Sequence, residues 1–225
     1  ISQMIKLRYY QNNTVDYMEL MLATRRHISP LIVAPTGGGK TIIFCEFIRR
    51  VVKQGLTYMV MANRQELIYQ PQGKLLTLAK ELEEPGLRPN VLMGGTPQYK
   101  NRGGWIASVQ TLQRRELPHA DIIIIDEAHL SASAKWEEMI KEYKERGAFV
   151  VGFTATPQRL DGKPLKILYD EIYQCGSVKN LTAEGFLVPV RYKYKAVNTS
   201  GLKLRGKDYD EKEMYQSIYK RGAIH

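Results

Sequence analysis

The sequence has few cysteines, few histidines and no long hydrophobic run, and each shortage excludes a class of protein. Its 225 residues include two cysteines, Cys45 and Cys175, which are too few for a disulfide framework. Neither lies in a Cys-x-x-Cys pair, and the four histidines are scattered, which disfavours a structural zinc site. No apolar run approaches the roughly 20 residues that a membrane-spanning helix needs. We therefore expect an intracellular protein, cytoplasmic or nucleoid-associated, with no membrane partner.

Acidic residues are also scarce relative to basic ones. The chain holds 33 lysines and arginines against 23 aspartates and glutamates, a formal net charge of +10. This excess favours a polyanionic partner such as nucleic acid, although a solvated basic surface gives the same charge. An apolar fraction of 44% is ordinary for a globular protein. The first residue is Ile1 rather than Met, so we expect a piece of a longer protein.

Short runs rich in Val and Ile alternate with amphipathic stretches of helical length. This alternation predicts an α/β fold with a mainly parallel sheet and helices on both faces. The runs are almost wholly apolar, so the strands should be buried on both sides. The expected strands are residues 31–34, 58–62, 106–109, 122–126 and 149–154. The expected helices are residues 15–25 behind a Thr14 cap, 41–54, 65–82, 112–117 and 133–146.

The pattern weakens after residue 156. Residues 165–173 and 178–184 read as helical or mixed, and residues 190–197 as a Tyr- and Lys-rich strand. Residues 198–225 are polar and charged, which indicates a linker or a partly ordered tail.

The first motif is a glycine-rich loop between a predicted strand and a predicted helix, APTGGGKT at residues 34–41. Glycines let several backbone N–H groups approach a phosphate chain at the positive end of a helix. Lys40 should then reach the β- and γ-phosphates, and the Thr41 hydroxyl should hold Mg²⁺. Ala34 stands where the strict Walker A pattern has glycine, and a plain glycine-rich turn is the alternative. The residues expected to bind nucleotide here are Thr36, Gly37, Gly38, Gly39, Lys40 and Thr41.

The second motif is an acidic tetrapeptide, DEAH at residues 126–129, at the end of a wholly apolar predicted strand. Ligands of open α/β folds bind at the carboxyl ends of the strands. Asp126 is therefore expected to hold Mg²⁺, and Glu127 to orient and deprotonate the attacking water. On its own the tetrapeptide could also be the acidic first turn of a helix.

The third motif is TATP at residues 154–157, which ends another buried strand with two hydroxyls and a proline. Alone it is a weak signal, because hydroxyl side chains commonly bond the backbone at strand ends.

In this order the three motifs resemble the first RecA-like lobe of a superfamily two helicase of the DEAH type. Restriction-enzyme motor subunits and excision-repair translocases belong to that branch. The resemblance covers residues 7–194 and implies a RecA-like three-layer domain over residues 1–195. It implies ATP and Mg²⁺ as cofactors and Lys40, Asp126 and Glu127 as catalytic residues. Residues 196–225 would then lead to a second RecA-like lobe of the same parent chain.

The resemblance gives meaning to residues that chemistry alone leaves open. Gln11 is implied to bond the adenine base, with Arg8 close to it. His129, Thr154 and Thr156 are implied to couple the nucleotide site to the nucleic-acid track, as a polar bridge with two hydrogen-bonded states.

Nucleic acid is implied to cross the lobe over segments between the first two motifs. Asn63 stands where family members usually have proline, which leaves the shape of that loop open. Such contacts fix position without reading sequence, and ordinary turn and cap roles are the alternative. The segment RLDG at residues 159–162 resembles the branch that favours DNA over RNA. The residues implied to contact nucleic acid are Arg64, Gln65, Gly95, Gln110 and Thr111.

The sequence thus predicts the nucleotide-binding lobe of an ATP-dependent DNA helicase or translocase. Nothing after residue 194 resembles the second lobe, so this piece should bind Mg-ATP weakly and hydrolyse it slowly. The alternative is a nucleotide-gated nucleic-acid-binding module that does not separate strands. A P-loop ATPase unrelated to nucleic acid is disfavoured by the pairing of DEAH with TATP and Gln11.

Overall fold

The computed structural model describes residues 6–63, 66–95, 104–130, 134–156 and 167–188, with the backbone of 204–205 and 208–209. The chain divides into two compact units, Ile1–Leu187 and Val188–His225. In the second unit, β8 (Leu204–Arg205) and β9 (Asp208–Tyr209) form an antiparallel pair. The predicted domain boundary near residue 195 lies outside the described residues and stays a prediction.

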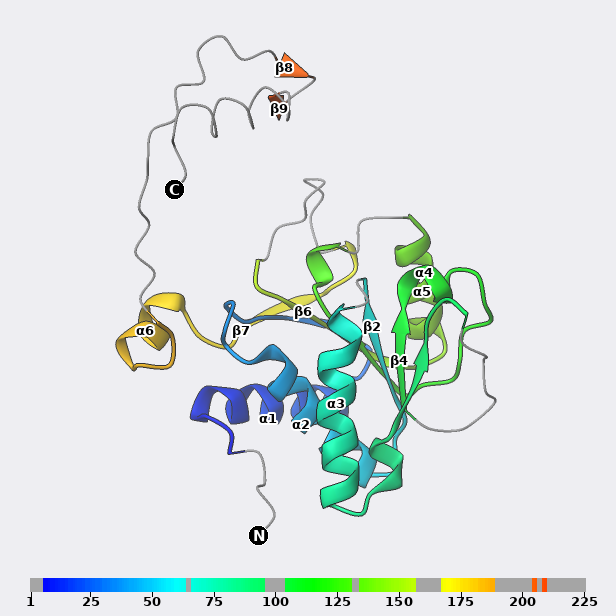
Figure 1. The fold of residues 1–225 in the computed structure, drawn as a ribbon, viewed down its shortest axis with the longest axis horizontal. Coiled ribbons are helices and arrows are strands. Elements are labelled where there is room, and N and C mark those ends of the chain that lie inside the picture. The colour runs from blue at the N-terminus through cyan, green and yellow to red at the C-terminus, as the bar shows by residue number, and fades with distance from the viewer. Residues whose placement is uncertain are drawn as a thin grey trace. The chain divides into compact units, whose positions relative to one another are not determined.

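The first unit is built on a seven-stranded sheet in the order β3-β4-β2-β5-β6-β1-β7 (Figure 1). Every pairing in it is parallel. The five inner strands are buried along their whole length, as their apolar runs predict. The strands are β1 (Pro30–Val33), β2 (Tyr58–Ala62), β3 (Pro89–Leu92), β4 (Gly104–Ser108), β5 (Ile122–Ile125), β6 (Phe149–Thr154) and β7 (Glu171–Gln174).

Helices cover both faces of the sheet. The described α-helices are α1 (Tyr9–Thr24), α2 (Lys40–Lys53), α3 (Glu66–Glu81), α4 (Val109–Leu112), α5 (Ala134–Glu145) and α6 (Val178–Ala183). Two 3₁₀ turns are η1 (Pro85–Leu87) and η2 (Ala128–Leu130). Among the described residues, no helix has the length and apolar character that crossing a membrane would require.

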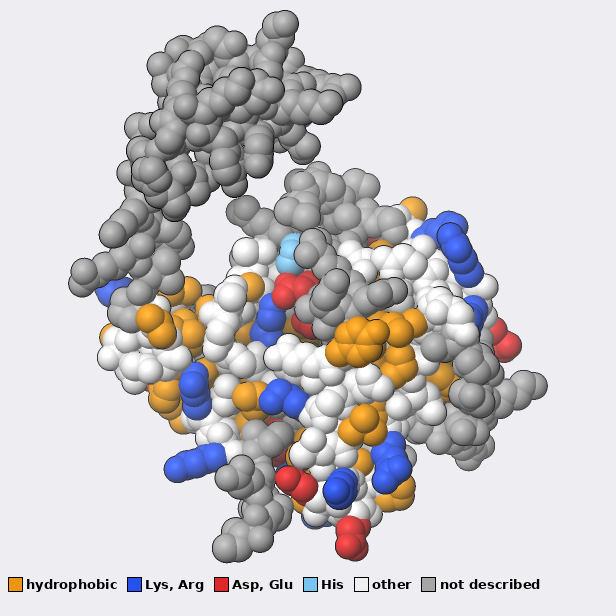
Figure 2. All heavy atoms as spheres, in the orientation of Figure 1, with side chains coloured by type: hydrophobic (Ala, Val, Ile, Leu, Met, Phe, Trp, Pro, Cys, Tyr) orange, Lys and Arg blue, Asp and Glu red, His pale blue; other side chains and the backbone are white. Residues whose placement is uncertain are grey.

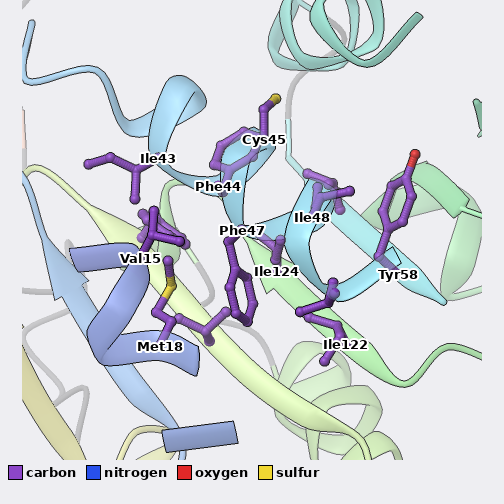
Figure 3. Packing of buried hydrophobic residues seen from close by; sticks show 14 of the residues in the cluster. Val15, Met18, Ile43, Phe44, Cys45, Phe47, Ile48, Tyr58, Ile122 and Ile124 are labelled. Carbon is purple, nitrogen blue, oxygen red and sulfur yellow. The ribbon is translucent and has the colours of Figure 1, made fainter. Parts of the chain in front are cut away.

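The core on the first face joins α1, α2 and α3 to the sheet. Figure 3 shows Val15 of α1 and Phe47 of α2 packed among the strand residues Ile122 and Ile124. Alternate strand residues point to the opposite face. There Ile123 and Ile125 join a second cluster with the α5 residues Trp136, Ile140 and Tyr143. The predicted three-layer α/β architecture is confirmed.

The first helix begins at Tyr9 rather than at residue 15, and the predicted Thr14 cap is wrong. Thr14 is buried inside α1, and its hydroxyl donates to Tyr10 O at 2.7 Å. A threonine hydroxyl can bond the carbonyl four residues earlier within a helix, so its presence does not mark a start. The N-cap of the helix is Arg8, and the Gln11 side chain reaches back to it: Gln11 Oε1 accepts from Arg8 N at 2.9 Å.

Three further segments differ from prediction. The helix expected over residues 112–117 is wrong: α4 begins directly after β4, spans Val109–Leu112 and shares only Leu112 with the prediction. Strand β7 occupies residues read as helical or mixed; alternate exposure along it shows a strand with one covered face. Strand β3 was not predicted, since it is a short edge strand that begins with proline and asparagine. The strand expected over residues 190–197 lies outside the described residues.

Candidate active site and adjoining groove

The strand order brings the three sequence motifs to one edge of the sheet. Strands β5, β6 and β1 are neighbours, and the carboxyl ends of parallel strands meet at the same edge. The glycine loop follows β1, Asp126 and Glu127 follow β5, and Thr154 ends β6. Figure 2 shows a histidine gathered with acidic and basic side chains at one place on this face. Residues up to 120 positions apart in sequence thereby form one site.

The glycine loop has a shape that only glycine allows. Gly37 and Gly39 both have φ of +81°, and Gly39 is the N-cap of α2. A Cβ on Gly38 would lie 2.9 Å from Pro35 O, and one on Gly39 would lie 2.5 Å from Gln11 Nε2. A glycine backbone at the start of a 14-residue helix presents N–H groups and positive charge to an anion. This donor set fits a phosphate chain.

Lys40 and Glu127 form a close ion pair at the centre of the site. Lys40 Nζ lies 2.6 Å from Glu127 Oε1, with side chains 15% and 23% exposed. Glu127 has φ of +50°, a left-handed conformation that costs energy for a residue with a Cβ. Its backbone N–H donates to Asp126 Oδ1 at 2.9 Å. The strained turn brings the Glu127 carboxylate to Lys40 at the end of the glycine loop, while the neighbouring Asp126 is buried.

Asp126 is an unusually buried carboxyl group. Only 6% of the residue is exposed, and burial raises its pKa to about 6, with the Lys40 charge acting to lower it and the Glu127 charge to raise it. A nearby divalent cation would favour the charged form of this group. The carboxylate and the Thr41 hydroxyl supply oxygen donors of the kind that Mg²⁺ prefers. In the described part of the chain, no group of three or more His, Cys, Asp or Glu side chains could hold a metal.

A polar chain leads from Glu127 to the end of β6. His129 Nδ1 lies 3.3 Å from Glu127 Oε2 and 3.0 Å from Thr154 Oγ1. The Thr154 hydroxyl donates to Thr156 O at 2.6 Å and accepts from Thr156 N at 3.1 Å. Because that hydrogen is used, Thr154 Oγ1 acts as acceptor toward His129, which requires a hydrogen on Nδ1. The residues predicted as a coupling element are thus in contact with one another and with Glu127.

The start of α1 contacts the glycine loop. Gln11 Nε2 donates to Gly38 O at 3.1 Å, and Tyr10 Oη donates to the same oxygen at 3.0 Å. Arg8 Nη1 donates to Tyr10 Oη at 3.1 Å. The residues implied to lie near a base are therefore beside the loop implied to hold its phosphates. Sequence reasoning missed Tyr10, for which its position next to Gln11 was the available signal.

A groove of about 580 Å³ adjoins the site along the same edge. It lies at the carboxyl ends of β3, β4 and β2, the other half of the sheet. Gly95, Gln110 and Thr111, predicted to contact nucleic acid, all line it. Arg64 and Gln65 lie outside the described residues. The described lining residues are Asn63, Gly94, Gly95, Ser108, Gln110, Thr111, Arg114 and Arg115.

Gln110 holds two loops of the groove together. Its Nε2 donates to Asn63 O and to Asn63 Oδ1, both at 3.0 Å. Its Oε1 accepts from Ser108 Oγ at 2.6 Å. Asn63, the departure from the family pattern, is thereby fixed to the end of β4. Sequence reasoning missed the cations of the groove, Arg114 and Arg115; their place three and four residues after Thr111 was the signal available.

Comparisons with known proteins agree on one family. A family profile described as "Type III restriction enzyme, res subunit" matches residues 4–159. The Saccharomyces cerevisiae protein "Putative ATP-dependent helicase IRC3" is 28% identical over 204 residues, which cover 83% of this chain and 28% of that protein. The "51.5 kDa protein" of a Lactococcus phage is 25% identical over 191 residues, which cover 84% of this chain and 38% of that protein. The chain thus spans about a third of the length of these relatives.

Several solved structures with the same fold are described as helicases. The DUF1998 helicase MrfA bound to DNA has a TM-score of 0.59 at 17% identity, covering 75% of this chain and 27% of that one. The Pyrococcus furiosus Hef helicase domain has a TM-score of 0.52 at 22% identity, covering 70% and 37%. At these identities the likeness establishes the fold, and it confirms the predicted RecA-like α/β class.

Proposed function

Since the chain belongs to the family of the type III restriction enzyme res subunit, we propose that it is the nucleotide-binding lobe of an ATP-dependent DNA motor. Family and fold confirm the resemblance to a first RecA-like lobe of superfamily two helicases. The observation that carries the proposal is the meeting of the glycine loop, DEAH and TATP segments at neighbouring strand ends, beside a groove with two arginines.

In the proposed reaction the glycine loop and Lys40 bind the phosphate chain of ATP. Thr41 and Asp126 would hold Mg²⁺, which when bound neutralises phosphate charge. Phosphate oxygens compete with Glu127 for Lys40, whose ammonium now lies 2.6 Å from that carboxylate. Glu127, once released from Lys40, orients and deprotonates the attacking water.

The coupling role rests on the polar chain from Glu127 to Thr156. His129 can bond both Glu127 and Thr154 from one nitrogen, so a change at Glu127 alters the bonding of Thr154. Such an exchange of partners provides the two states that a motor needs. The groove at the neighbouring strand ends is the proposed track for the nucleic-acid backbone. Its two arginines supply charge, and its polar side chains and glycines supply room and neutral donors.

The proposed partners are DNA, in preference to RNA, and a second RecA-like lobe of the parent chain. Two solved relatives are described as bound to DNA or to a DNA substrate mimic. The chain covers only part of those proteins, and the second lobe supplies arginine fingers that are worth about 10³- to 10⁵-fold in related hydrolases. We expect the isolated chain to hydrolyse ATP slowly.

The deciding experiment measures ATP turnover by the longest natural chain that contains these residues. Turnover is compared in Mg²⁺ with no nucleic acid, single-stranded DNA, duplex DNA and RNA, with Glu127→Gln as the inactive control. Stimulation by DNA that disappears in Glu127→Gln supports a DNA motor. Turnover that responds to no nucleic acid would refute it. DNA-dependent turnover without strand displacement or movement would favour the nucleotide-gated binding module.

A further inference from the structure

Residues 184–187 close the end of α6 and turn the chain back toward the start of α1. Phe186 N donates to Leu181 O at 2.8 Å, and Gly185 N donates to Thr182 O at 3.0 Å. This pair of bonds is a Schellman motif. Gly185 has φ of +76°, and a Cβ there would meet nothing within 4 Å, so backbone conformation is what requires glycine. The local turn therefore fixes the direction of the Phe186 side chain.

Phe186 lies against the first residues of α1, although nearly the whole unit separates them in sequence. Its ring centroid is 5.6 Å from that of Tyr10 and 6.0 Å from that of Tyr9. The Arg8 guanidinium lies over the ring at 5.0 Å, and Arg8 Nη1 donates to Phe186 O at 3.1 Å. Tyr9 Oη donates to Glu184 Oε2 at 2.7 Å. Figure 1 shows α6 beside the start of α1.

The same segment borders the glycine loop. A Cβ on Gly37 would lie 3.3 Å from Leu187 Cδ2, so Leu187 is in van der Waals reach of the loop. Tyr10 touches Phe186 with its ring and donates from its hydroxyl to Gly38 O. Contacts therefore run without a break from the glycine loop through the start of α1 to the end of the first unit.

The contacts of Phe186 restrict Arg8 to one orientation. A free arginine side chain has rotamer entropy, part of which is lost whenever the guanidinium binds a ligand. Here the carbonyl oxygen and the ring of Phe186 already hold the guanidinium, so less remains to be lost. A planar cation held in place is a good surface for a nucleobase, which it can contact by stacking.

We propose that Phe186 is a positioning residue of the nucleotide site, which holds Arg8 for the base and thereby favours a nucleoside triphosphate over bare triphosphate. This inference rests on the proposed function, because it requires the glycine loop to bind a nucleotide. It also requires a bound base to stabilise the Schellman turn, where the first compact unit ends.

The first experiment separates the base from the phosphates. Dissociation constants for Mg-ATP and Mg-tripolyphosphate are measured for wild type, Phe186→Ala and Phe186→Tyr. Val178→Ala, an exposed position at the start of the preceding helix α6, is the matched control. Phe186→Ala should weaken ATP binding about threefold to tenfold, because it removes the ring that holds the Arg8 guanidinium while the backbone carbonyl of residue 186 remains. Tripolyphosphate affinity should stay within about twofold, and Phe186→Tyr should restore ATP binding.

The second experiment uses unaltered protein and so does not depend on the fold of a variant. Hydrogen exchange is followed at the amides of Phe186 and Leu187, which both donate to Leu181 O. Saturating ATP should slow their exchange about threefold or more, whereas tripolyphosphate should not.

The outcomes separate this inference from the function on which it rests. Wild-type protein that binds neither ATP nor tripolyphosphate would remove the nucleotide site and the inference together. Wild-type binding with equal losses for both ligands in Phe186→Ala, or no loss at all, would overturn the inference alone. Equal protection of the Phe186 amide by ATP and tripolyphosphate would also overturn it.

Discussion

Glu127 is the central residue of the candidate site, because each of its two carboxylate oxygens contacts a different side chain. Lys40 lies 2.6 Å from one oxygen and His129 3.3 Å from the other. The strained backbone that places it there, with φ of +50°, is the kind of local cost that persists where function requires it. The backbone N–H of Glu127 donates to the Asp126 carboxylate, which helps to fix the position of Asp126 beside it.

Glu127→Gln should preserve nucleotide binding and lose turnover. The amide keeps the size of the side chain but is a poor base, so turnover should fall about 100-fold or more, the lower range for a lost general base. ATP affinity should change little, or rise, because Lys40 loses a competing carboxylate. Binding is measured by calorimetry and turnover by phosphate release, with Glu138→Gln on α5 as control. An unchanged rate would show that another group activates the water.

Asp126→Asn should stabilise the chain at neutral pH and lose this advantage in acid. A folded-state pKa of about 6 instead of 3.8 means that the charged carboxyl opposes folding by about 3 kcal/mol. Below pH 4 the group is neutral in both states and the cost vanishes; as pH rises from 4 to 6, wild type loses stability relative to the variant. Denaturant unfolding at pH 4 and pH 8 measures the gap. A gap that is equal at both pH values would contradict the burial of a charged Asp126.

At the scale of elements, ion pairs as well as apolar packing join α1 to α2. Arg50 of α2 donates to Asp16 and Glu19 of α1 at 2.6 and 2.7 Å. It also bonds Glu46, whose burial acts to raise its pKa but whose bonds to Arg49 and Arg50 lower it overall. Because α1 carries Tyr10 and Gln11 and has Arg8 as its N-cap, these ion pairs also help to position the residues proposed to lie near the base.

The Tyr58 ring of β2 lies where a side chain on Gly104 of β4 would be, so this position requires glycine. A Cβ on Gly104 would lie 2.0 Å from Tyr58 Cζ, and the Tyr58 hydroxyl is itself bonded to Leu87 O at 2.8 Å. Gly104→Ala should lower the free energy of unfolding by about 3 kcal/mol or more, because a fully buried ring must move. Gly73→Ala, at an open position in α3, should raise it by up to about 1 kcal/mol. Equal effects of both changes in denaturant unfolding would contradict the packing described.

At the scale of the whole molecule, the two surfaces proposed to be functional share one edge of one sheet. Strands β5, β6 and β1 lead into the residues proposed to bind nucleotide, and β3, β4 and β2 lead into the groove. Strand β2 pairs with β5, so the two halves are continuous through buried backbone. The chain has a net charge of +10, and two of its arginines, Arg114 and Arg115, line the groove and place positive charge there.

Replacing Arg114 and Arg115 together by alanine should weaken single-stranded DNA binding and reduce its salt dependence. Each phosphate contact that is lost should lower the slope of log K against log salt by about 0.7. The losses should be similar for all sequences, since backbone contacts carry no sequence information. Binding is followed by fluorescence anisotropy across salt concentrations. Arg88→Ala, an exposed arginine before the start of β3 at the opposite edge of the sheet, is the matched control.

An unchanged salt slope in the Arg114→Ala/Arg115→Ala variant would remove the groove from the nucleic-acid track. Equal losses in Arg88→Ala would mean that overall charge, rather than the groove, attracts DNA.

The buried strands, the class of fold and the chemical motifs could be predicted from local sequence patterns. Strands 58–62 and 149–154 were predicted to the residue, because short, mainly apolar runs that follow helical stretches leave few alternatives. The glycine loop, Asp126 and Glu127 were recognisable because phosphate and metal chemistry demands those residue types at strand ends. Local signals failed where they were ambiguous, at Thr14 and in β7.

Which of these residues lie in contact could not be predicted from such patterns and follows from the packing of the whole domain. Strand order is set by packing over the whole sheet, and no local pattern reveals that β1 lies between β6 and β7. That order brings Thr154 to His129 and Glu127 to Lys40. Side-chain partners were equally hidden, since Gln110 was predicted as a nucleic-acid contact but bonds Asn63 and Ser108 within the chain. Phe186 reaches Arg8 for the same physical reason: contacts between distant segments follow from how whole layers pack.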